Sequence, residues 1–444
     1  MRIAIIGSGP AGFYAAEALL KRTDAVADVD MFDRLPTPYG LVRGGVAPDH
    51  QKIKGVTRVF ASTAARPSFR FLGNVRLGRD LTVDDLRRHY HQIVYATGNE
   101  SDRRLGIPGE GIPRSTPATV FVGWYNGHPD YRRAELDFSV RRVAIIGNGN
   151  VAVDVARMLL RTPAELERTD VAPYALEALR RSQVREVFMI GRRGPAQAAF
   201  SPAELEELGK LDAADPVVDP ADLGGQEDPE GRQNLAILRD FAARRPRSDT
   251  RRLHFLFLRS PVEVLADPAG GVAGLALERN RLEARADGTL AARGTGERER
   301  LEMGMVLPAV GYAADPIPGV PFDAKARTIA NDDGRVVDPA TRARVPNEYV
   351  VGWARSGAQG LIGEHKKASA QVVAHMIEDA PGVEARPLPP REAVDALLRE
   401  RDVRVVTFDD WRRLDEIEVA RGARRGAPRE KFSEVEAILK VLGK

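Results

Sequence analysis

Two stretches of the chain share one pattern of apolar and glycine positions. Residues 2–6 are almost all apolar, as in a strand buried on both faces; a glycine-rich turn follows, and apolar residues then recur at helical spacing over 11–22. Residues 141–161 repeat this order, and each copy is followed by a further apolar run, at 29–33 and 184–191. The pattern predicts two βαβ units and hence an α/β protein.

The segments between and after these units predict how they are connected. We expect a helix over 50–64, a buried strand over 92–98 and, because Pro, Gly and aromatic residues are frequent there, a packed linker over 103–140. The acidic, Pro- and Gly-rich residues 203–230 predict a surface loop, and the arginine-rich residues 232–252 predict a basic helix.

The last part of the chain predicts strands and then a return to the first unit. Residues 253–313 contain apolar runs and alternation typical of a meander of strands. A strand, a glycine-rich turn and a helix follow within 348–377, without a third βαβ unit. We therefore predict a second domain inserted into the first, with residues 1–102 and 322–444 in one domain and residues 103–321 in the other.

Composition narrows the classes of function. The chain has 444 residues, more than one hydrophobic core usually organises, which agrees with two domains. It contains no cysteine, which excludes iron–sulfur clusters, redox-active cysteine pairs, thiolate zinc sites and disulfides of its own, so a bound cofactor must perform any redox chemistry. The net charge is only +3 and no basic run is interleaved with aromatic residues, so nucleic-acid binding is not expected.

The N-terminus and the apolar runs bear on location. Met1 and Arg2 lead directly into the first apolar run, which leaves no room for a signal peptide, and no apolar run is long enough to cross a bilayer. We therefore expect a cytoplasmic protein that does not enter membranes.

The first turn has the spacing of a dinucleotide-binding fingerprint. Gly7, Gly9 and Gly12 form GxGxxG between a predicted strand and a predicted helix, and Asp33 ends the next strand. The glycines permit the tight turn, the close approach of backbone to pyrophosphate and the packing of helix on strand, while the carboxylate can accept hydrogen bonds from ribose hydroxyls. A purely structural glycine turn is the alternative, but the strand, the helix and the acid together favour a dinucleotide site.

The second turn differs at the end of the strand that follows it. Gly147, Gly149 and Ala152 form GxGxxA, but the next strand ends in Arg192 and Arg193 rather than in an acid. Unless they are ordinary solvated charges, these guanidinium groups favour a 2′-phosphate that a carboxylate would repel, and so favour NADP over NAD. With two dinucleotide sites and no cysteine, the economical assignment is FAD at the first turn and NADPH at the second.

Several longer segments occur along the chain in the order of one known family. They are PTPYGLVRGGVAPDH, VYATGNESDRRLGIPGE, FVGWYNGHP, GNGNVAVDVAR, IGRRGPAQAAF and GWARSGAQGLIG, with WRRLDEIEVARGARRGAPREKF near the C-terminus. In these segments the chain resembles the adrenodoxin-reductase-like ferredoxin–NADP reductases. The resemblance implies two Rossmann-like domains of the three-layer ββα type, related to the disulfide reductases but lacking their redox disulfide. It also implies a ferredoxin–NADP oxidoreductase that contains FAD.

The resemblance also implies which residues hold the two nucleotides, and it implies no metal site. FAD contacts are expected from the first turn and from the loops after the strands: Pro10, Ala11, Arg34, Gly40, Leu41, Val42, Ala96, Thr97, Gly98, Gly352, Trp353, Gly360, Leu361 and Ile362. The two arginines are expected to hold the 2′-phosphate of NADP. The rest of that nucleotide is expected at Asn148, Asn150 and Val151, with Glu204 near a ribose.

His50 and Asp154 resemble a histidine and an aspartate that lie near the flavin and the nicotinamide in this family. An interdomain pair is therefore expected, and it could fix the orientation of the imidazole and tune the local charge. Direct proton transfer by the histidine is an alternative, although hydride transfer to flavin does not by itself demand it. Gln51, and the pair Glu364 and His365, depart from the residues usual at these places. The pair lies close to where the nicotinamide would stack, which puts the details of the nicotinamide pocket in question.

Partners and competing functions follow from the same features. The arginines from Arg232 to Arg252 are the expected docking region for an acidic ferredoxin, with a solvated helix face as the alternative, and we expect a monomer or a weak dimer. Trp124 and Tyr125 are more typical of packing than of flavin stacking, and His128 is expected to be structural. The competing functions are a flavin monooxygenase or quinone-reducing diaphorase, and an FAD-binding subunit or sensor without turnover.

Overall fold

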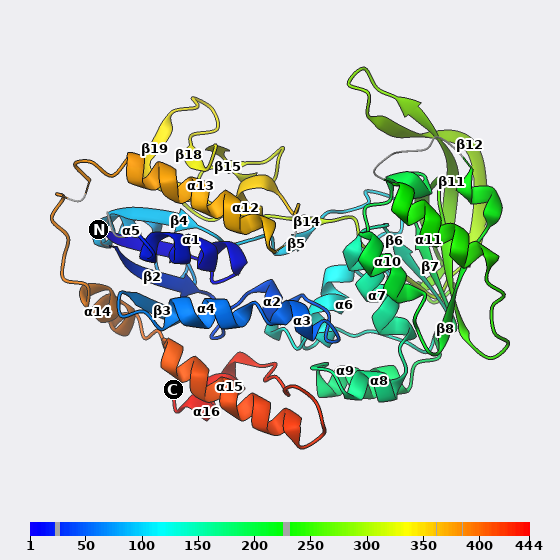
Figure 1. The fold of residues 1–444 in the computed structure, drawn as a ribbon, viewed down its shortest axis with the longest axis horizontal. Helices are drawn as coiled ribbons and strands as arrows, with labels where there is room; N and C mark the ends of the chain where they lie inside the picture. The colour runs from blue at the N-terminus through cyan, green and yellow to red at the C-terminus, as the bar shows by residue number, and fades with distance from the viewer. Residues whose placement is uncertain (23–26, 225–230, 361, 384) are drawn as a thin grey trace.

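The protein has two halves, each built around a largely parallel sheet (Figure 1). A computed structural model describes residues 1–22, 27–224, 231–360, 362–383 and 385–444. In Figure 1 the first half lies at the left and the second at the right, with the C-terminal helices α15 (Phe408–Ala423) and α16 (Val435–Leu442) below.

The first half contains a seven-stranded sheet in the order β17-β18-β19-β4-β1-β2-β3. Its strands are β1 (Arg2–Ile6), β2 (Asp28–Asp33), β3 (Phe69–Gly73), β4 (Gln92–Tyr95), β17 (Asn331–Asp332), β18 (Arg335–Val337) and β19 (Arg344–Val350). Strands β1 to β4 and β19 are parallel, whereas β17 and β18 form an antiparallel edge. Because Val94 of β4 pairs with Tyr349 of β19, the predicted return of the chain to the first sheet is confirmed.

Successive side chains of β1 point to opposite faces of this sheet. Ile3 and Ile5 join a core with α1 and α13, whereas Ala4 and Ile6 join a second core with α5 and α14. The other helices of this half are α2 to α4 and α12, beside the C-terminal pair. The bounds are α1 (Pro10–Leu20), α2 (Leu41–Gly44), α3 (Gln51–Lys54), α4 (Thr57–Ala64), α5 (Val83–His89), α12 (Trp353–Ser356), α13 (Glu364–Glu378) and α14 (Ala393–Glu400).

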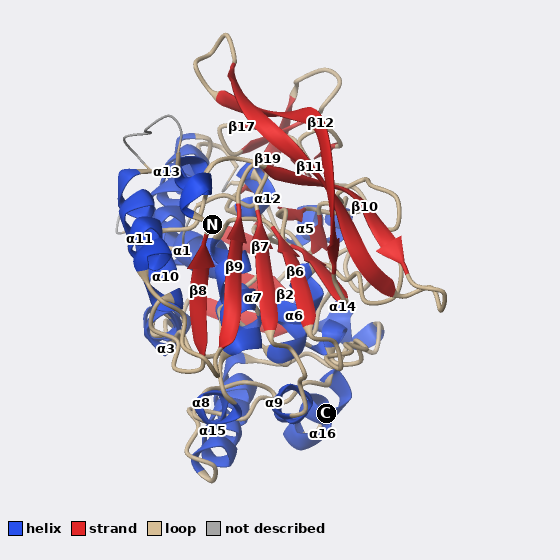
Figure 2. Cartoon of the chain, turned by 90° about the vertical axis from the view of Figure 1, so that its right-hand side faces the viewer, coloured by secondary structure: helices blue, strands red, loops and turns tan. Residues whose placement is uncertain are grey.

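The second half contains a five-stranded parallel sheet in the order β13-β6-β7-β9-β8 (Figure 2). Its strands are β6 (Arg142–Ile146), β7 (Glu186–Ile190), β8 (Ala214–Val218), β9 (Arg251–Leu256) and β13 (Met305–Pro308). Its helices are α6 (Ala118–Tyr125), α7 (Asn150–Leu160), α8 (Pro163–Glu167), α9 (Pro173–Arg180), α10 (Pro202–Leu208) and α11 (Arg232–Ala243).

The same alternation in β6 produces three layers. Val143 and Ile145 face the helices, whereas Ala144 and Ile146 face an antiparallel sheet. That sheet consists of β10 (Arg259–Ala266), β11 (Val272–Ala284) and β12 (Leu290–Glu302), and the hairpin of β11 and β12 projects beyond the body in Figure 1. The expected α/β fold with two Rossmann-like units is confirmed, and the ββα layering is clearest in this half.

The chain crosses between the halves twice, and the two crossings lie side by side. Strand β5 (Ser101–Asp102) pairs antiparallel with β14 (Tyr312–Ala313), with Asp102 opposite Tyr312. A short hairpin, β15 (Phe322–Asp323) and β16 (Thr328–Ile329), follows. The domain boundaries at 102/103 and 321/322 remain a prediction, since the paired crossings fix where the chain passes rather than where a domain ends.

Three local predictions differ from the structure. The predicted loop over 203–230 contains most of α10 and the edge strand β8, because the Pro- and Asp-rich composition hides an inward-facing Ala214 and Val218; residues 225–230 lie outside the described part. The helix predicted over 232–252 ends at Ala243, and the one over 50–64 is interrupted between α3 and α4.

The segment predicted as a packed linker contributes a helix to the core of the second half. Trp124 and Tyr125 of α6 are buried and lie against the ring of Phe121, so the packing interpretation is confirmed. His128 is also largely enclosed, and its Nδ1 accepts the Asp130 N–H at 3.2 Å, which agrees with a structural role.

Candidate active site

The first glycine turn lies between β1 and α1, at the carboxyl end of the parallel strands. Gly7 has a φ of +107°, and a Cβ there would overlap the carbonyl oxygen of Ala96, so no other residue fits without strain. Gly9 directly precedes α1, and a Cβ on it would meet nothing within 4 Å. Open space in front of a helix N-terminus is the arrangement that receives a pyrophosphate.

Asp33 lies at the end of β2 and is held by the turn itself. Its Oδ2 accepts hydrogen bonds from the Ser8 backbone N–H at 2.9 Å and from the Ser8 hydroxyl at 2.5 Å, while Oδ1 accepts the Leu35 N–H at 2.9 Å. A carboxylate has about four acceptor positions, so one remains for a ribose hydroxyl. Ser8 was not among the predicted site residues, although its place inside the glycine motif could have indicated this contact.

Two segments distant in sequence close over the first turn. A Cβ on Gly40 would lie 3.0 Å from the Gly9 Cα, and α2 begins at the next residue, Leu41. From the other end of the chain, Gly352 approaches α1 so closely that a Cβ on it would lie 2.5 Å from the Ala11 Cβ. The structure thus fits a dinucleotide at this turn and supplies it with a cover.

Of the other predicted FAD residues, some lie beside the first turn and others have partners within the protein. Ala96, Thr97 and Gly98 follow β4, and the Ala96 N–H donates to the Ile6 carbonyl at 2.7 Å, beside the turn. The Arg34 guanidinium contacts Glu100 and Asp130 at 2.7 Å each, so its contact with FAD remains a prediction.

Three rings gather at Trp353, the first residue of α12. The Trp353 ring centroid lies 5.3 Å from that of Tyr312 and 6.5 Å from that of His365. Burial lowers the pKa of His365, although Glu364 favours its charged form. Ile362 packs against the first core and Gly360 has a φ of +84°, whereas Leu361 lies outside the described residues.

The second glycine turn repeats the geometry of the first between β6 and α7. Gly147 has a φ of +144°, and a Cβ there would overlap the carbonyl oxygen of Ala309, while a Cβ on Gly149 would meet nothing within 4 Å. Ala152 takes the place of the third glycine, and its N–H donates to the Gly149 carbonyl at 3.0 Å. Val151 lies in the first turn of α7.

The polar side chains around the second turn are only partly satisfied. The Asn150 Oδ1 accepts the Ser201 N–H at 2.8 Å. Among the described residues, however, the Asn148 Oδ1 and the Gln197 Nε2 are buried without a hydrogen-bond partner. Buried amide groups in this state are costly, and a bound nucleotide could satisfy them.

Arg192 and Arg193 follow β7 at the place where a Rossmann unit contacts the adenosine ribose. Both side chains are exposed, and neither makes an ion pair with any residue that the structure describes. Two unpaired guanidinium groups beside an open glycine turn fit a nucleotide with a 2′-phosphate.

The predicted pair of His50 and Asp154 meets between the halves. His50 directly precedes α3, and its Nδ1 lies 3.8 Å from the Asp154 Oδ1 on α7. Its shortest contact is instead with Glu207 of α10, whose Oε2 lies 3.0 Å from Nε2, and Glu204 lies at 3.7 Å. The imidazole is therefore held among three carboxylates rather than by one.

Arg157 organises this cluster and was missed by the sequence analysis. Its side chain is fully buried and donates to Asp154 at 2.8 Å, to Glu207 at 2.5 Å and to Glu204 at 3.2 Å. It also donates across the boundary to Asp49 at 3.1 Å. The sequence does indicate such a cluster, because Arg157 stands among the apolar residues of a predicted buried helix and a buried charge needs partners of opposite charge.

Burial and charge set the protonation of Asp154. Burial raises its pKa to about 7, although Arg157 and His50 favour the charged form. Near neutral pH this carboxyl can therefore gain or lose a proton at the boundary of the two halves.

The same cluster contains residue types that bind metal ions, but its charges are already paired. His50, Glu204 and Glu207 each place one ligand atom within 4.8 Å of the others. Because the Arg157 guanidinium already contacts both glutamates, a metal ion would have to displace a buried cation.

Comparisons with known proteins agree with this geometry. Residues 1–189 match the family described as pyridine nucleotide-disulphide oxidoreductase. NADPH-ferredoxin reductase FprA of Mycobacterium tuberculosis is 44% identical over 99% of this chain and 98% of its own. The mitochondrial NADPH:adrenodoxin oxidoreductase of Homo sapiens is 43% identical over 100% of this chain and 92% of its own. This chain belongs to the family of NADPH-ferredoxin and NADPH:adrenodoxin reductases.

A solved structure of this reductase family shows the same fold. Mycobacterium tuberculosis FprA in complex with NADPH superposes with a TM-score of 0.95 at 43% identity, covering 100% of this chain and 99% of that chain. The fold and the recognition from sequence are thereby confirmed for this reductase.

Several arginines of the arginine-rich segment already have partners within the protein. Four of its arginines are engaged: Arg244 with Asp240, Arg247 and Arg252 with Asp215, and Arg251 with the carbonyls of Leu159 and Arg161. Arg232, Arg239 and Arg245 are exposed and make no ion pair within the described ranges of the chain. Among the described residues of this segment, these three arginines are the ones whose charge is not compensated by an ion pair.

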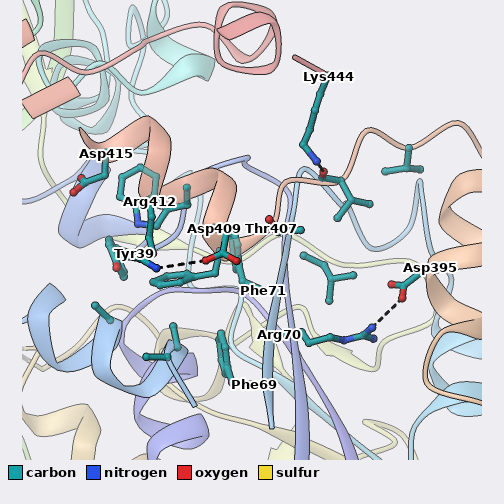
Figure 3. Close-up of a pocket in the computed structure, with 18 of the residues that line it drawn as sticks. Tyr39, Phe69, Arg70, Phe71, Asp395, Thr407, Asp409, Arg412, Asp415 and Lys444 are labelled. Atoms are coloured by element: carbon teal, nitrogen blue, oxygen red, sulfur yellow. Dashed lines mark hydrogen bonds and ion pairs between the residues drawn. The ribbon is translucent and has the colours of Figure 1, made fainter. Parts of the chain in front are cut away.

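A large cavity of the protein lies away from both turns. It has a volume of about 1240 Å³ and lies between the edge strand β3 and α15 (Figure 3). Phe69, Phe71 and Trp411 line it together with charged residues such as Arg70 and Asp395, which form an ion pair at 2.9 Å. No predicted cofactor residue lines this cavity, so its size does not mark the active site.

Within the described residues, no helix has the length and apolar character that crossing a membrane requires.

Proposed function

We propose that this protein is a ferredoxin–NADP reductase that transfers electrons between NADPH and a ferredoxin-type iron–sulfur protein through bound FAD. The observation that carries the proposal is the meeting of His50, from the segment after the first turn, with Asp154, from the helix of the second turn. Two nucleotides bound at these turns would extend toward that meeting point. The related proteins are named as NADPH-ferredoxin and NADPH:adrenodoxin reductases, which supports the assignment.

The first turn is the proposed FAD site. The open space before α1 receives the pyrophosphate, Asp33 accepts a ribose hydroxyl, and the segments at Gly40 and Gly352 retain the cofactor. When bound, FAD would accept a hydride and release electrons singly, which the chain, lacking cysteine, cannot do itself. The other FAD residues implied by the family, including Arg34 and Trp353, belong to this proposal.

The second turn is the proposed NADPH site. Asn148, Asn150 and Val151 lie at the pyrophosphate, and Arg192 and Arg193 hold the 2′-phosphate through charge-assisted hydrogen bonds. Glu204 is proposed to lie near a ribose of the same nucleotide. Its carboxylate would then contact the ribose and accept the Arg157 hydrogen bond at the same time.

His50 and Asp154 are proposed to act where the nicotinamide meets the flavin. Arg157 and the surrounding carboxylates hold the imidazole in one orientation, and Asp154 can carry a proton near neutral pH. Their proposed role is to set orientation and local charge rather than to transfer a proton, since hydride transfer between bound nucleotides would not require a proton from either side chain.

An acidic ferredoxin is the proposed partner, with Arg232, Arg239 and Arg245 as its docking residues. Opposite charges would accelerate encounter, so the rate should fall as salt rises. We expect Arg239→Glu to raise the KM for ferredoxin about threefold to tenfold and to weaken the salt dependence, with reduction by NADPH unchanged. Arg58→Glu, at an exposed arginine of α4 without an ion pair to a described residue, is the matched control.

Anaerobic stopped-flow measurement tests the function. The purified protein should be yellow, NADPH should bleach its visible flavin absorbance, and an oxidised ferredoxin should then restore it. Oxygen consumption with a substrate but no transfer to ferredoxin would favour a monooxygenase, and transfer only to quinones would favour a diaphorase. A yellow protein that NADPH does not bleach would instead support the subunit or sensor without turnover.

The cellular setting belongs to the same proposal. We propose a cytoplasmic protein that works as a monomer or a weak dimer. Light scattering across a concentration series of the purified protein would test the oligomeric state.

A further inference from the structure

The loop that carries Arg192 and Arg193 is fixed from outside by the long hairpin of β11 and β12. We propose that Asn280 of β11 is a positioning residue that sets the preference of the second site for a 2′-phosphorylated nucleotide. This inference rests on the proposed NADPH site and identifies what makes that site selective.

Asn280 makes a direct contact with the arginine loop. Its side-chain amide is buried, with 8% exposure, and its Nδ2 donates to the Arg192 carbonyl at 2.9 Å and to the Ser260 hydroxyl at 2.8 Å. Both N–H groups of the amide are therefore used, one on the loop and one on β10. A buried amide satisfied in this way holds its partner in place.

The carbonyls on either side of Arg192 are held by backbone groups. The Gly191 carbonyl accepts the Arg259 N–H at 3.0 Å, and the Arg193 carbonyl accepts the Leu258 N–H at 3.1 Å. The Asn280 N–H in turn donates to the Leu258 carbonyl at 2.8 Å. Of the three successive carbonyls of the loop, only that of Arg192 depends on a side chain.

An irregularity in the hairpin coincides with Asn280. Glu278 pairs with Arg298, but Asn280 pairs with Gly294, so the register of the two strands shifts at this point. Such shifts are a known means of redirecting a side chain, and here the redirected side chain is the one that reaches the loop.

The arrangement explains how two exposed arginines can be selective. Their side chains are long and unpaired, so holding a phosphate costs conformational freedom unless the backbone from which they project is already fixed. Asn280 fixes that backbone at Arg192. A nucleotide without the 2′-phosphate gains nothing from the two guanidinium groups and should not respond to Asn280.

Binding of 2′,5′-ADP and of ADP, measured by calorimetry on the flavin-loaded protein, tests this. We expect Asn280→Ala to weaken 2′,5′-ADP about tenfold while ADP binding and the KM for NADH change by less than about twofold. Ser260→Ala removes the other partner of the same amide and should leave 2′,5′-ADP within about twofold of wild type. Arg192→Ala gives the full loss for comparison.

The outcomes separate this inference from the proposed function. Equal weakening of both ligands by Asn280→Ala, or no weakening of either, overturns the role of Asn280 provided that Arg192→Ala abolishes the preference. If the wild-type protein shows no preference for 2′,5′-ADP and Arg192→Ala changes nothing, the NADPH assignment itself fails. If Asn280→Ala does not fold, Asn280→Ser replaces it as the test. Serine keeps a polar group in the buried position but is too short to reach the Arg192 carbonyl, so the same selective loss of 2′,5′-ADP binding is expected.

Discussion

The two glycine turns have the same backbone and opposite electrostatics. Gly7 and Gly147 both need positive φ, and Gly9 and Gly149 both leave open space before a helix. At the first turn, however, Asp33 is fixed by three hydrogen bonds, whereas Arg192 and Arg193 at the second are exposed and unpaired within the described chain. In the proposed assignment, the turn provides the general site for a dinucleotide, and the end of the following strand decides which dinucleotide binds.

The two turns also differ in how they are covered. Segments around Gly40 and Gly352, far apart in the chain, both close on the first turn. The second turn is bordered by residues of its own half, with Ala199 donating to Asn148 and Ser201 to Asn150 at 2.8 Å each. A covered site suits a cofactor that stays, and a more open one suits a nucleotide that must exchange at every turnover.

The largest loss of stability is expected from replacing Arg157, which links the helix after the second turn to Asp49 of the first half. Arg157→Ala should lower the free energy of unfolding by about 3–5 kcal/mol, because it leaves buried carboxylates without their cation. Arg161→Ala is the matched control, since Arg161 contacts Asp49 at 2.9 Å but is partly exposed, and should cost about 1 kcal/mol. Urea denaturation measures both; equal losses would contradict a special role for Arg157.

Replacing Gly7 or Gly147, the two glycines with positive φ at the turns, should abolish nucleotide binding at one site and leave the other intact. Gly7→Ala is expected to cost about 3 kcal/mol and to release FAD, because the new Cβ overlaps the Ala96 carbonyl. Gly147→Ala meets the Ala309 carbonyl in the same way, yet should keep the flavin and lose NADPH binding. The flavin-to-protein absorbance ratio and NADPH titration distinguish the two variants; loss of flavin from both would show that the turns do not act independently.

Asp154 should make stability depend on pH. Its pKa of about 7 in the folded protein lies above the value near 3.9 of an unfolded chain, so the folded state binds more protons between those values and its stability falls as pH rises. Over pH 5.5 to 7.5 this contribution is about 2 kcal/mol, and Asp154→Asn should remove it. Denaturation midpoints at several pH values test this, and an unchanged pH dependence in the variant would contradict it.

The smallest expected effects come from the open glycines. Ala at Gly9 or Gly149 meets no chain atom within 4 Å and should fold normally. The added methyl would nevertheless enter the space proposed for the pyrophosphate, weakening FAD or NADPH respectively by about tenfold. Fluorescence titration measures both, and unchanged affinities would place the pyrophosphates elsewhere.

Most of the fold was predictable because its signals are local. Apolar runs of strand length, glycine turns and helical spacing predicted both βαβ units, and the strand near Tyr349 was correctly predicted to return to the first sheet. Composition is a poorer guide than pattern in two places. The Pro- and Asp-rich composition around β8 predicts a loop where the structure has a strand, and the arginines after Ala243 predict a helix that has already ended.

The sequence by itself determined the two glycine turns that we propose as nucleotide sites, because a glycine turn and the charge at the end of the next strand lie within one supersecondary unit. Only the tertiary structure decided what joins and tunes them. Arg157 reaches Asp49 across 108 positions, and Asn280 reaches Arg192 across 88. Such contacts depend on how distant elements pack, and residue spacing along the chain carries no record of that packing.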